Sequence, residues 1–203
     1  MQQDQYMKKS LLVAAKKQGL SDRTKITVLC DGANNCWNIA DSLREHCSSF
    51  LGILDWFHIA MKFQNISLPK TQKAILEKVK WCLWRGKIDK ALDKLDTLIS
   101  RVKNTTRLVK LLKLKTYLSN NSNHIVNYEL QKNNNLPFTS NIAESTVESL
   151  INQRCKGHQH MRWTREGVHK LLQTRAYITS SDWWSGWLDK VMGAMYKLSP
   201  LTI

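Results

Sequence analysis

The chain has 203 residues, of which 42% are hydrophobic, and its 31 lysines and arginines outnumber its 16 aspartates and glutamates to give a formal net charge of +15. This length allows one domain, or one compact domain with a helical insertion. No apolar run approaches the ~20 residues of a membrane span, and the N-terminal sequence lacks the apolar core of a signal peptide, so we expect a cytoplasmic protein with no membrane partner.

The first part of the chain predicts a strand–helix–strand unit. Apolar and β-branched residues indicate the strands, and apolar side chains at helical spacing indicate the helices. Such a unit makes its two strands parallel, so Asp31 and Asp55, which follow the strands, are expected at one edge of the sheet. Ligands bind at that edge in open α/β sheets. The predicted elements are a helix over 6–18, a strand over 25–30, a helix over 36–47 and a strand over 50–55.

The rest of the chain is expected to be mostly helical. An asparagine-rich segment over 119–135 predicts an exposed loop. Trp81 and Trp84 lie three residues apart on one helix face, which favours core anchors over platforms for base stacking. The tryptophan-rich segment 183–187 is expected to pack onto the last two helices. The predicted helices cover 57–66, 70–85, 87–100, 102–117, 142–155 and 165–178.

Basic charge is concentrated in two segments. Residues 61–117 hold fifteen basic and four acidic side chains, a net charge of +11, and residues 154–175 hold six basic and one acidic, a net charge of +5. Solvated lysine-rich helix faces are common, but two such segments favour a polyanion partner, because each neutralised phosphate releases counterions. The chain thus divides into a strand–helix–strand unit (1–60), a basic helical insertion (61–118), an Asn-rich loop (119–138) and C-terminal helices (139–203).

The five cysteines are odd in number and widely spaced, and no secretory signal precedes them. Reduced thiols are therefore expected rather than a disulfide framework. Two groups are candidates for zinc ligands, but neither has the tight Cys-x-x-Cys pair of a structural zinc site. The first is Cys30, Cys36, His46 and Cys47, and the second is Cys155, His158 and His160.

Two aspartates at adjacent strand ends indicate a site for a divalent cation. Mg²⁺ takes hard oxygen ligands, with one or two carboxylates plus phosphate oxygens. A two-metal site for phosphoryl transfer needs a further carboxylate, for which Glu144 and Glu148 are candidates, four residues apart on one helix face. Each also fits the spacing of a helix capping box, with Asn141 and Ser145 respectively. Spacing alone does not choose between them.

Seven blocks of the sequence, in order, resemble the bacterial insertion-sequence transposases of the Kra type, which belong to the DDE class. The similarity covers most of the chain, and its last block is the most specific. It implies a ribonuclease-H-like α/β core that keeps two parallel strands, a helical insertion, an acidic triad that binds two Mg²⁺, DNA as substrate and a homo-oligomer when complete. The blocks are 31–33 (DGA), 37–40 (WNIA), 53–58 (ILDWFH), 74–92, 144–145 (ES), 153–157 (QRCKG) and 161–167 (MRWTREG).

The resemblance also implies roles for individual residues. Asp31 corresponds to the second aspartate of the triad. The family places its glutamate nine residues before a Gln-Arg pair, which selects Glu144. Asp55 and His58 match an Asp-x-x-His motif, and we expect them to shape the site or to contact DNA. The residues of the second basic segment expected to bind DNA are Arg154, Lys156, Arg162, Trp163 and Arg165.

The chain departs from the family in two places. Thr139-Ser140-Asn141 stands where the family often has Gly-Ser-Gly, and neither Asp4 nor Asp22 follows a strand as the first catalytic aspartate should. We therefore expect the C-terminal portion of a transposase for Mg-dependent cutting and joining of DNA strands in insertion-sequence transposition, inactive by itself. The alternatives are a non-catalytic DNA-binding protein derived from a transposase, and a metal-dependent nuclease that uses Asp31, Asp55 and Glu144.

Overall fold

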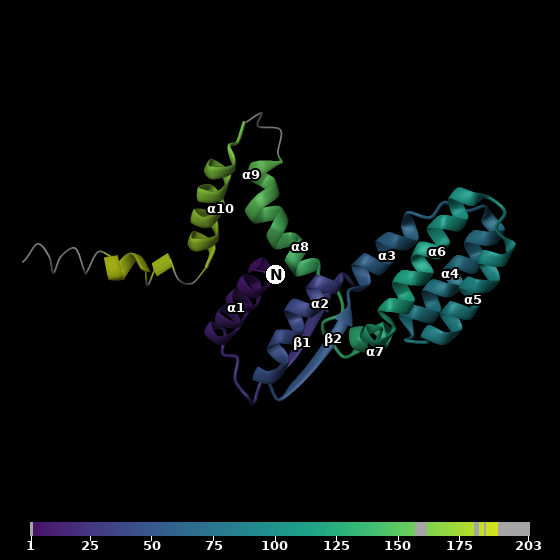
Figure 1. Cartoon of the computed structure of the whole chain (residues 1–203), viewed down its shortest axis with the longest axis horizontal. Coiled ribbons are helices and arrows are strands. Elements are labelled where there is room, and N and C mark those ends of the chain that lie inside the picture. The colour runs from purple at the N-terminus through teal and green to yellow at the C-terminus, as the bar shows by residue number, and fades with distance from the viewer. Residues whose placement is uncertain (1, 157–161, 181–182, 185, 191–203) are drawn as a thin grey trace, which may run out of the picture. The chain divides into compact units, whose positions relative to one another are not determined.

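The structure is a computed structural model that describes residues 2–156, 162–180, 183–184 and 186–190 (Figure 1). The chain divides into two compact units, Met1–Ser140 and Asn141–Ile203. The described part is mostly helical and carries one small parallel sheet of two strands, so the fold is a mixed α/β fold.

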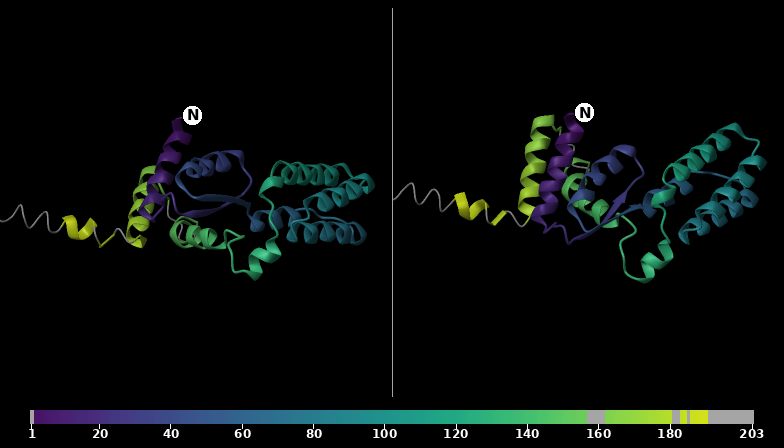
Figure 2. Two further views of the ribbon diagram at one scale, coloured as in Figure 1. Left: turned by 90° about the horizontal axis from the view of Figure 1, so that it is seen from below. Right: turned by 60° about the horizontal axis from the view of Figure 1, so that its bottom comes forward.

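The sheet of the first unit pairs β1 (Lys25–Cys30) with β2 (Ser49–Leu54), and the two strands are parallel, as the sequence predicts. The register aligns Cys30 with Leu54, so both strands end level with each other. Figure 2 shows the crossover passing over one face of the strand pair. The crossover consists of α2 (Asn34–Ala40) and the 3₁₀ helix η1 (Asp41–His46).

The crossover differs from the single helix predicted over 36–47. It starts two residues earlier and tightens into a 3₁₀ helix after Ala40. Ser42 donates its hydroxyl to the carbonyl oxygen of Ile39 at 2.6 Å, and Arg44 pairs with Asp41 at 2.9 Å. Such short-range side-chain bonds compete with the regular α-helical ladder. Helix α1 (Gln2–Lys17) packs on α2, where Lys8 donates to Asn38 at 2.8 Å.

The helical region that follows β2 begins and ends within about three residues of the predicted bounds. Asp55 caps the first helix and Asn104 caps the last by accepting from backbone N–H groups. Gly86, at a φ of 68°, reverses the chain between the second and third helices. Leucines make up most of the buried interior of this helical region, and Ile59, Val79 and Ala91 are fully buried among them. The helices are α3 (Trp56–Gln64), α4 (Lys70–Trp84), α5 (Ile88–Arg101) and α6 (Thr105–Asn120).

The asparagine-rich segment is not the exposed loop that its composition predicts. It contains the 3₁₀ helix η2 (Ser122–His124) and helix α7 (Tyr128–Asn133). Tyr128 is fully buried and donates its hydroxyl to the carbonyl oxygen of Leu54 at 2.7 Å. His124 stacks on Trp37 with ring centroids 3.8 Å apart. Buried aromatic residues between the asparagines hold this segment against the sheet, and local composition misses them.

The two tryptophans of α4 behave differently. Trp84 packs against Trp56, Tyr128 and Phe138 with ring centroids 4.8–6.1 Å from its neighbours, which agrees with the predicted anchor role. The same prediction is wrong for Trp81, whose side chain is 56% exposed. The buried side of α4 consists of Leu76, Val79 and Leu83. Trp81 lies two residues from both Val79 and Leu83, so it points to the opposite side of the helix.

The second unit is a helical hairpin. Its first arm changes from α to π geometry and back, and its second arm is capped by Thr164, which accepts from the N–H of Gly167 at 3.1 Å. Arg175 donates to the carbonyl oxygens of Leu150 and Ser149, both at 2.8 Å, and so joins the arms. The elements are α8 (Asn141–Val147), the π helix η3 (Glu148–Asn152), α9 (Gln153–Cys155) and α10 (Arg165–Thr179).

The tryptophans of segment 183–187 pack onto the preceding helices only in part. Trp183 contacts Tyr177 edge to face with ring centroids 5.5 Å apart, whereas the side chains of Trp184 and Trp187 stay 67% and 46% exposed. All five cysteines are free. Residues 157–161, with His158 and His160, lie outside the described residues. No helix in the described ranges combines the length and apolar character of a membrane span.

Candidate functional site

Asp31 directly follows β1, at the carboxyl end of the parallel strands. Its side-chain oxygen Oδ1 accepts from the N–H of Ala33 at 2.9 Å, which closes a tight turn. Its main-chain carbonyl accepts from the hydroxyl of Tyr117 on α6 at 2.8 Å. The residue is nevertheless exposed. Tyr117 thus holds the backbone of Asp31 and the N–H of Ala33 orients its carboxylate, while the residue stays exposed to solvent, an arrangement suited to binding a cation.

The turn after Asp31 depends on Gly32. Its φ of 91° lies in the left-handed region of backbone conformation, which residues other than glycine rarely adopt. A Cβ there would lie 2.7 Å from Cε2 of Tyr117, 2.9 Å from Cδ1 of Leu54 and 3.0 Å from Nδ2 of Asn121. The turn therefore sits in a tight space bounded by β2 and the end of α6.

We expect Gly32→Ala to destabilise the fold more than Gly19→Ala. Gly19 has a similar φ of 93° but no atom within 4 Å of an added Cβ, so its substitution measures backbone strain alone, roughly 1 kcal/mol. Gly32→Ala adds steric overlap, for a total of roughly 2–4 kcal/mol. Urea denaturation of the two variants measures the difference. Equal losses would show that the space around Gly32 relaxes without cost.

Two thiols lie beside Asp31. Burial raises the pKa of Cys36, and the charge of Asp31 and a hydrogen bond to it raise that pKa further. Burial, followed by the nearby Cys36, Asp31 and Asp41, raises the pKa of Cys30 to about 12. Without a bound cation both thiols stay protonated near neutral pH. In the ranges that the structure describes, no three His, Cys, Asp or Glu side chains come close enough to hold a metal ion.

Asp55 occupies the equivalent position after β2 but is buried, with 1% of its surface exposed. Its Oδ1 accepts from the N–H groups of Phe57 at 3.1 Å and Ser140 at 3.0 Å. Its Oδ2 accepts from the hydroxyl of Ser140 at 2.6 Å and also lies 2.6 Å from Nδ1 of His58. Burial alone raises the pKa of Asp55, but the hydrogen bonds from Ser140, His58 and Phe57 outweigh it and hold the pKa below its usual value.

This geometry assigns Asp55 a structural part. Both of its oxygens are already engaged by protein donors, so it has little capacity left for a cation. It caps α3 and fixes Ser140, the residue immediately before α8. Asp55 and His58 therefore organise the chain around the end of β2. A nuclease that takes Asp55 as a metal ligand is disfavoured by this arrangement.

Sequence reasoning missed three residues that support this region. Ser140 binds Asp55, and its only sequence signal is the serine that it shares with the Gly-Ser-Gly of the resembled family. Tyr117 binds the backbone of Asp31. Asn121 accepts from Nε1 of Trp37 at 2.8 Å. These last two partners lie 86 and 84 residues away in sequence, where local pattern carries no information.

The two glutamates belong to the second unit. Glu144 lies in the first turn of α8 and is exposed. Glu148 begins the π helix, and its Oε2 accepts from Nδ2 of Asn152 at 2.7 Å. Ser145 donates to the carbonyl oxygen of Asn141 at 2.9 Å from inside the helix, so it does not cap a helix as the second capping-box interpretation requires. Asp31 and Glu144 are thus in different units.

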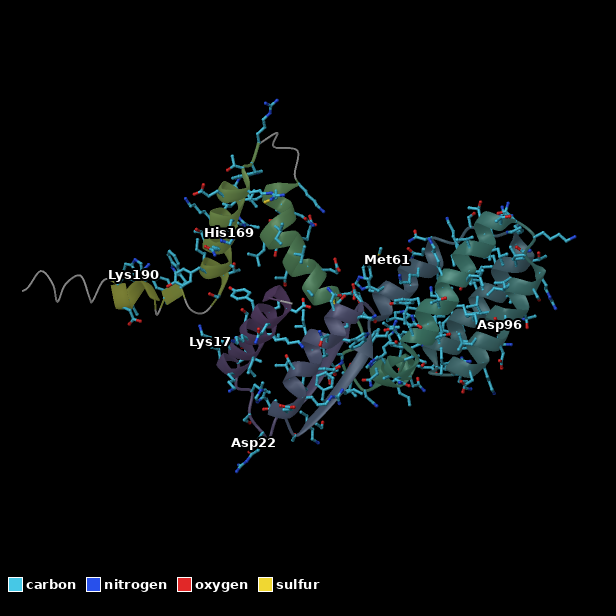
Figure 3. All side chains as sticks on the ribbon, viewed as in Figure 1. Lys17, Asp22, Met61, Asp96, His169 and Lys190 are labelled. Carbon is cyan, nitrogen blue, oxygen red and sulfur yellow. The ribbon has the colours of Figure 1, made fainter. Side chains whose placement is uncertain are left out.

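The cationic candidates lie at the connection between the arms of the second unit. Arg154, Lys156, Arg162 and Arg165 are exposed, and Trp163 is half-buried. Glu166, the one acidic residue of this segment, pairs with Lys170 at 2.6 Å. In the first unit Lys115 pairs with Asp96, which Figure 3 labels on α5.

Comparison of the chain with protein-family models, with curated proteins and with solved structures gives no match.

Proposed function

We propose that the chain is the C-terminal portion of a DDE-class DNA transposase that cuts and joins DNA strands during transposition of an insertion sequence. The observation that carries this proposal is the exposed carboxylate of Asp31 at the carboxyl end of parallel β1. The resemblance of the seven sequence blocks supports it. In this proposal the two strands and their crossover are part of a ribonuclease-H-like core, and the complete protein acts in the cytoplasm as a homo-oligomer.

Asp31 and Glu144 are the residues that would hold Mg²⁺ in the complete enzyme. Bound Mg²⁺ ions would activate the attacking hydroxyl and stabilise the leaving oxygen. The chain's own part is positioning. Tyr117 and Gly32 fix the backbone that carries Asp31, and the bonds of Asp55 to Ser140 fix the residue immediately before α8, the helix that carries Glu144. The exposed arginines and lysines of the second unit would neutralise DNA phosphates.

A second candidate function is non-catalytic DNA binding. It requires only basic side chains that can reach DNA, and Arg154, Lys156, Arg162 and Arg165 are exposed. The basic surface serves either function. Strand transfer by a complete enzyme separates the two candidates, because only the catalytic one requires the carboxylates of Asp31 and Glu144.

We expect the purified chain to bind duplex DNA with a strong dependence on salt. Each phosphate contact contributes about −0.9 to the slope of log affinity against log salt, so four contacts reduce affinity roughly 150-fold between 50 and 200 mM salt. Fluorescence anisotropy with a labelled duplex measures the slope, and chelation of divalent cations should leave affinity unchanged. A flat salt response, or no binding at 50 mM salt, would contradict the DNA-binding proposal.

A further inference from the structure

Trp81 lies between two adjacent hollows, one formed by α3 and α4 and the other by α4 and α5. The first, which we call the tryptophan pocket, has a volume of about 220 Å³ and is lined by Trp56, Glu77, Lys80, Trp81 and Trp84. The second, which we call the lysine groove, has a volume of about 520 Å³, and its lining includes Lys78, Trp81, Arg85, Lys87, Lys90 and Lys94. Trp81 is common to both.

The lysine groove has five cationic side chains and no carboxylate in its lining. Nε of Arg85 lies 3.5 Å from Glu129 of α7. In the part of the chain that the structure describes, the four lysines of the groove form no ion pair. This concentration of uncompensated positive charge fits a chain of phosphates rather than a single small anion.

The tryptophan pocket is built for one flat ring. Trp56 and Trp84 meet edge to face at 4.8 Å, and Trp84 is fixed in turn by Tyr128 and Phe138. Trp81 faces solvent, at 56% exposure. The volume is below the roughly 300–1,000 Å³ of sites for drug-sized ligands, so a single base fits and a duplex does not. Glu77 and Lys80 add an acceptor and a donor of hydrogen bonds for the edge of a base.

We propose that α4 and α5 bind one unpaired nucleotide of a DNA strand, with its base stacked on Trp81 in the tryptophan pocket and its neighbouring phosphates in the lysine groove. The proposal deepens the proposed function and rests on it in one respect, that DNA is the partner. Aromatic stacking of this kind accepts any base, because every base has a π face. The site therefore selects an extruded or single-stranded nucleotide rather than a sequence.

The test compares three labelled DNAs with the full chain by fluorescence anisotropy. They are a paired duplex, the same duplex with one extra unpaired adenine, and the same bulged duplex with an abasic site in place of the adenine. The chain should bind the bulged duplex roughly 5- to 150-fold more tightly than the other two, since stacking of one base contributes about 1–3 kcal/mol. Trp81→Ala should remove this preference, and Trp81→Phe should retain part of it.

Two matched controls accompany these variants. Trp184→Ala removes an exposed tryptophan from the other unit and should preserve the preference. Lys90→Ala combined with Lys94→Ala should weaken binding to all three DNAs more than Lys9→Ala combined with Lys16→Ala, which removes the same charge from α1. Thermal melting of each variant confirms that the fold is kept.

The outcomes separate this proposal from the proposed function. Equal affinity for the three DNAs, or a preference that persists in Trp81→Ala, overturns the nucleotide site and leaves DNA binding standing. A loss of self-association in Trp81→Ala with unchanged DNA affinity identifies the surface as a contact between copies, and also overturns it. Failure to bind any of the DNAs at low salt overturns both proposals.

Discussion

Glu144→Gln should abolish strand transfer by a complete transposase that contains this chain, while Glu148→Gln should leave most of the activity. The change at Glu144 keeps the size of the side chain but removes the charge that holds the cation. Loss of even an outer partner of a metal ligand costs roughly 10–100-fold, so we expect a loss of more than about a hundredfold here. Glu148 already accepts from Asn152, and its change costs one exposed hydrogen bond, about 1 kcal/mol at most.

The measurement is strand transfer with a labelled DNA end and Mg²⁺, with DNA affinity recorded in parallel. Asp31→Asn serves as a positive control, because the amide oxygen can still accept from the N–H of Ala33 and the turn is kept. Both Glu144→Gln and Asp31→Asn should bind DNA as the unchanged protein does. An inactive Glu148→Gln together with an active Glu144→Gln would place the metal ligand one helical turn further along the chain.

Asp55→Ala should cost roughly 3–5 kcal/mol of unfolding free energy, the largest effect on stability that we expect from a single substitution outside the leucine core. The carboxylate is buried and serves four donor contacts, from Phe57, Ser140 and His58. Its removal leaves buried donors unpaired and uncaps α3. Asp55→Asn should cost less, since its oxygen still accepts from the two N–H groups. Ser140→Ala removes one hydroxyl and should cost about 1–2 kcal/mol.

The same carboxylate makes stability depend on pH. Its pKa is lower in the folded chain than its ordinary value of 3.8, so its contribution is complete above about pH 4 and is lost as pH falls through the folded pKa. Urea denaturation between pH 2 and pH 7 should show this loss in the unchanged chain and a flatter profile in Asp55→Asn. Parallel profiles for the two proteins would show that Asp55 is not ionised in the fold.

The sequence predicts the elements of this fold better than it predicts their contacts. The β-branched run at 25–30 and the leucine spacing of α4–α6 fix strands and helices locally, and their bounds agree closely. Tyr117, Asn121 and Tyr128 act through partners 74–86 residues away, which no local pattern reveals. The prediction that Trp81 is a core anchor fails for a different reason. Helical spacing shows that Trp81 shares a face with Trp84, but only the packing of neighbouring segments decides how much of that face is buried.

In the candidate site, too, the sequence predicts the local elements but not the long-range contacts. The position of Asp31 after a strand follows from the sequence, and so does its neighbour Gly32 at a turn. That Asp55 would be saturated by protein donors does not follow, because Ser140 arrives from a segment 85 residues later. A carboxylate that the sequence suggests as a second metal ligand thereby becomes a structural cap, and only three-dimensional contacts distinguish the two roles.

Bonds from α6, the following residue Asn121 and α7 reach back to the strand–crossover–strand unit, and they limit how this protein can change its length over evolution. Tyr117 reaches the backbone of Asp31, Asn121 reaches Trp37, and Tyr128 reaches Leu54. A deletion that joined β2 directly to α8 would expose all three partners and open a void beside Gly32. The helices between β2 and α8 therefore cannot be removed or replaced without disturbing the rest of the first unit. Natural insertions and deletions should instead gather at the turns remote from the sheet, such as the one between α5 and α6 at 102–104.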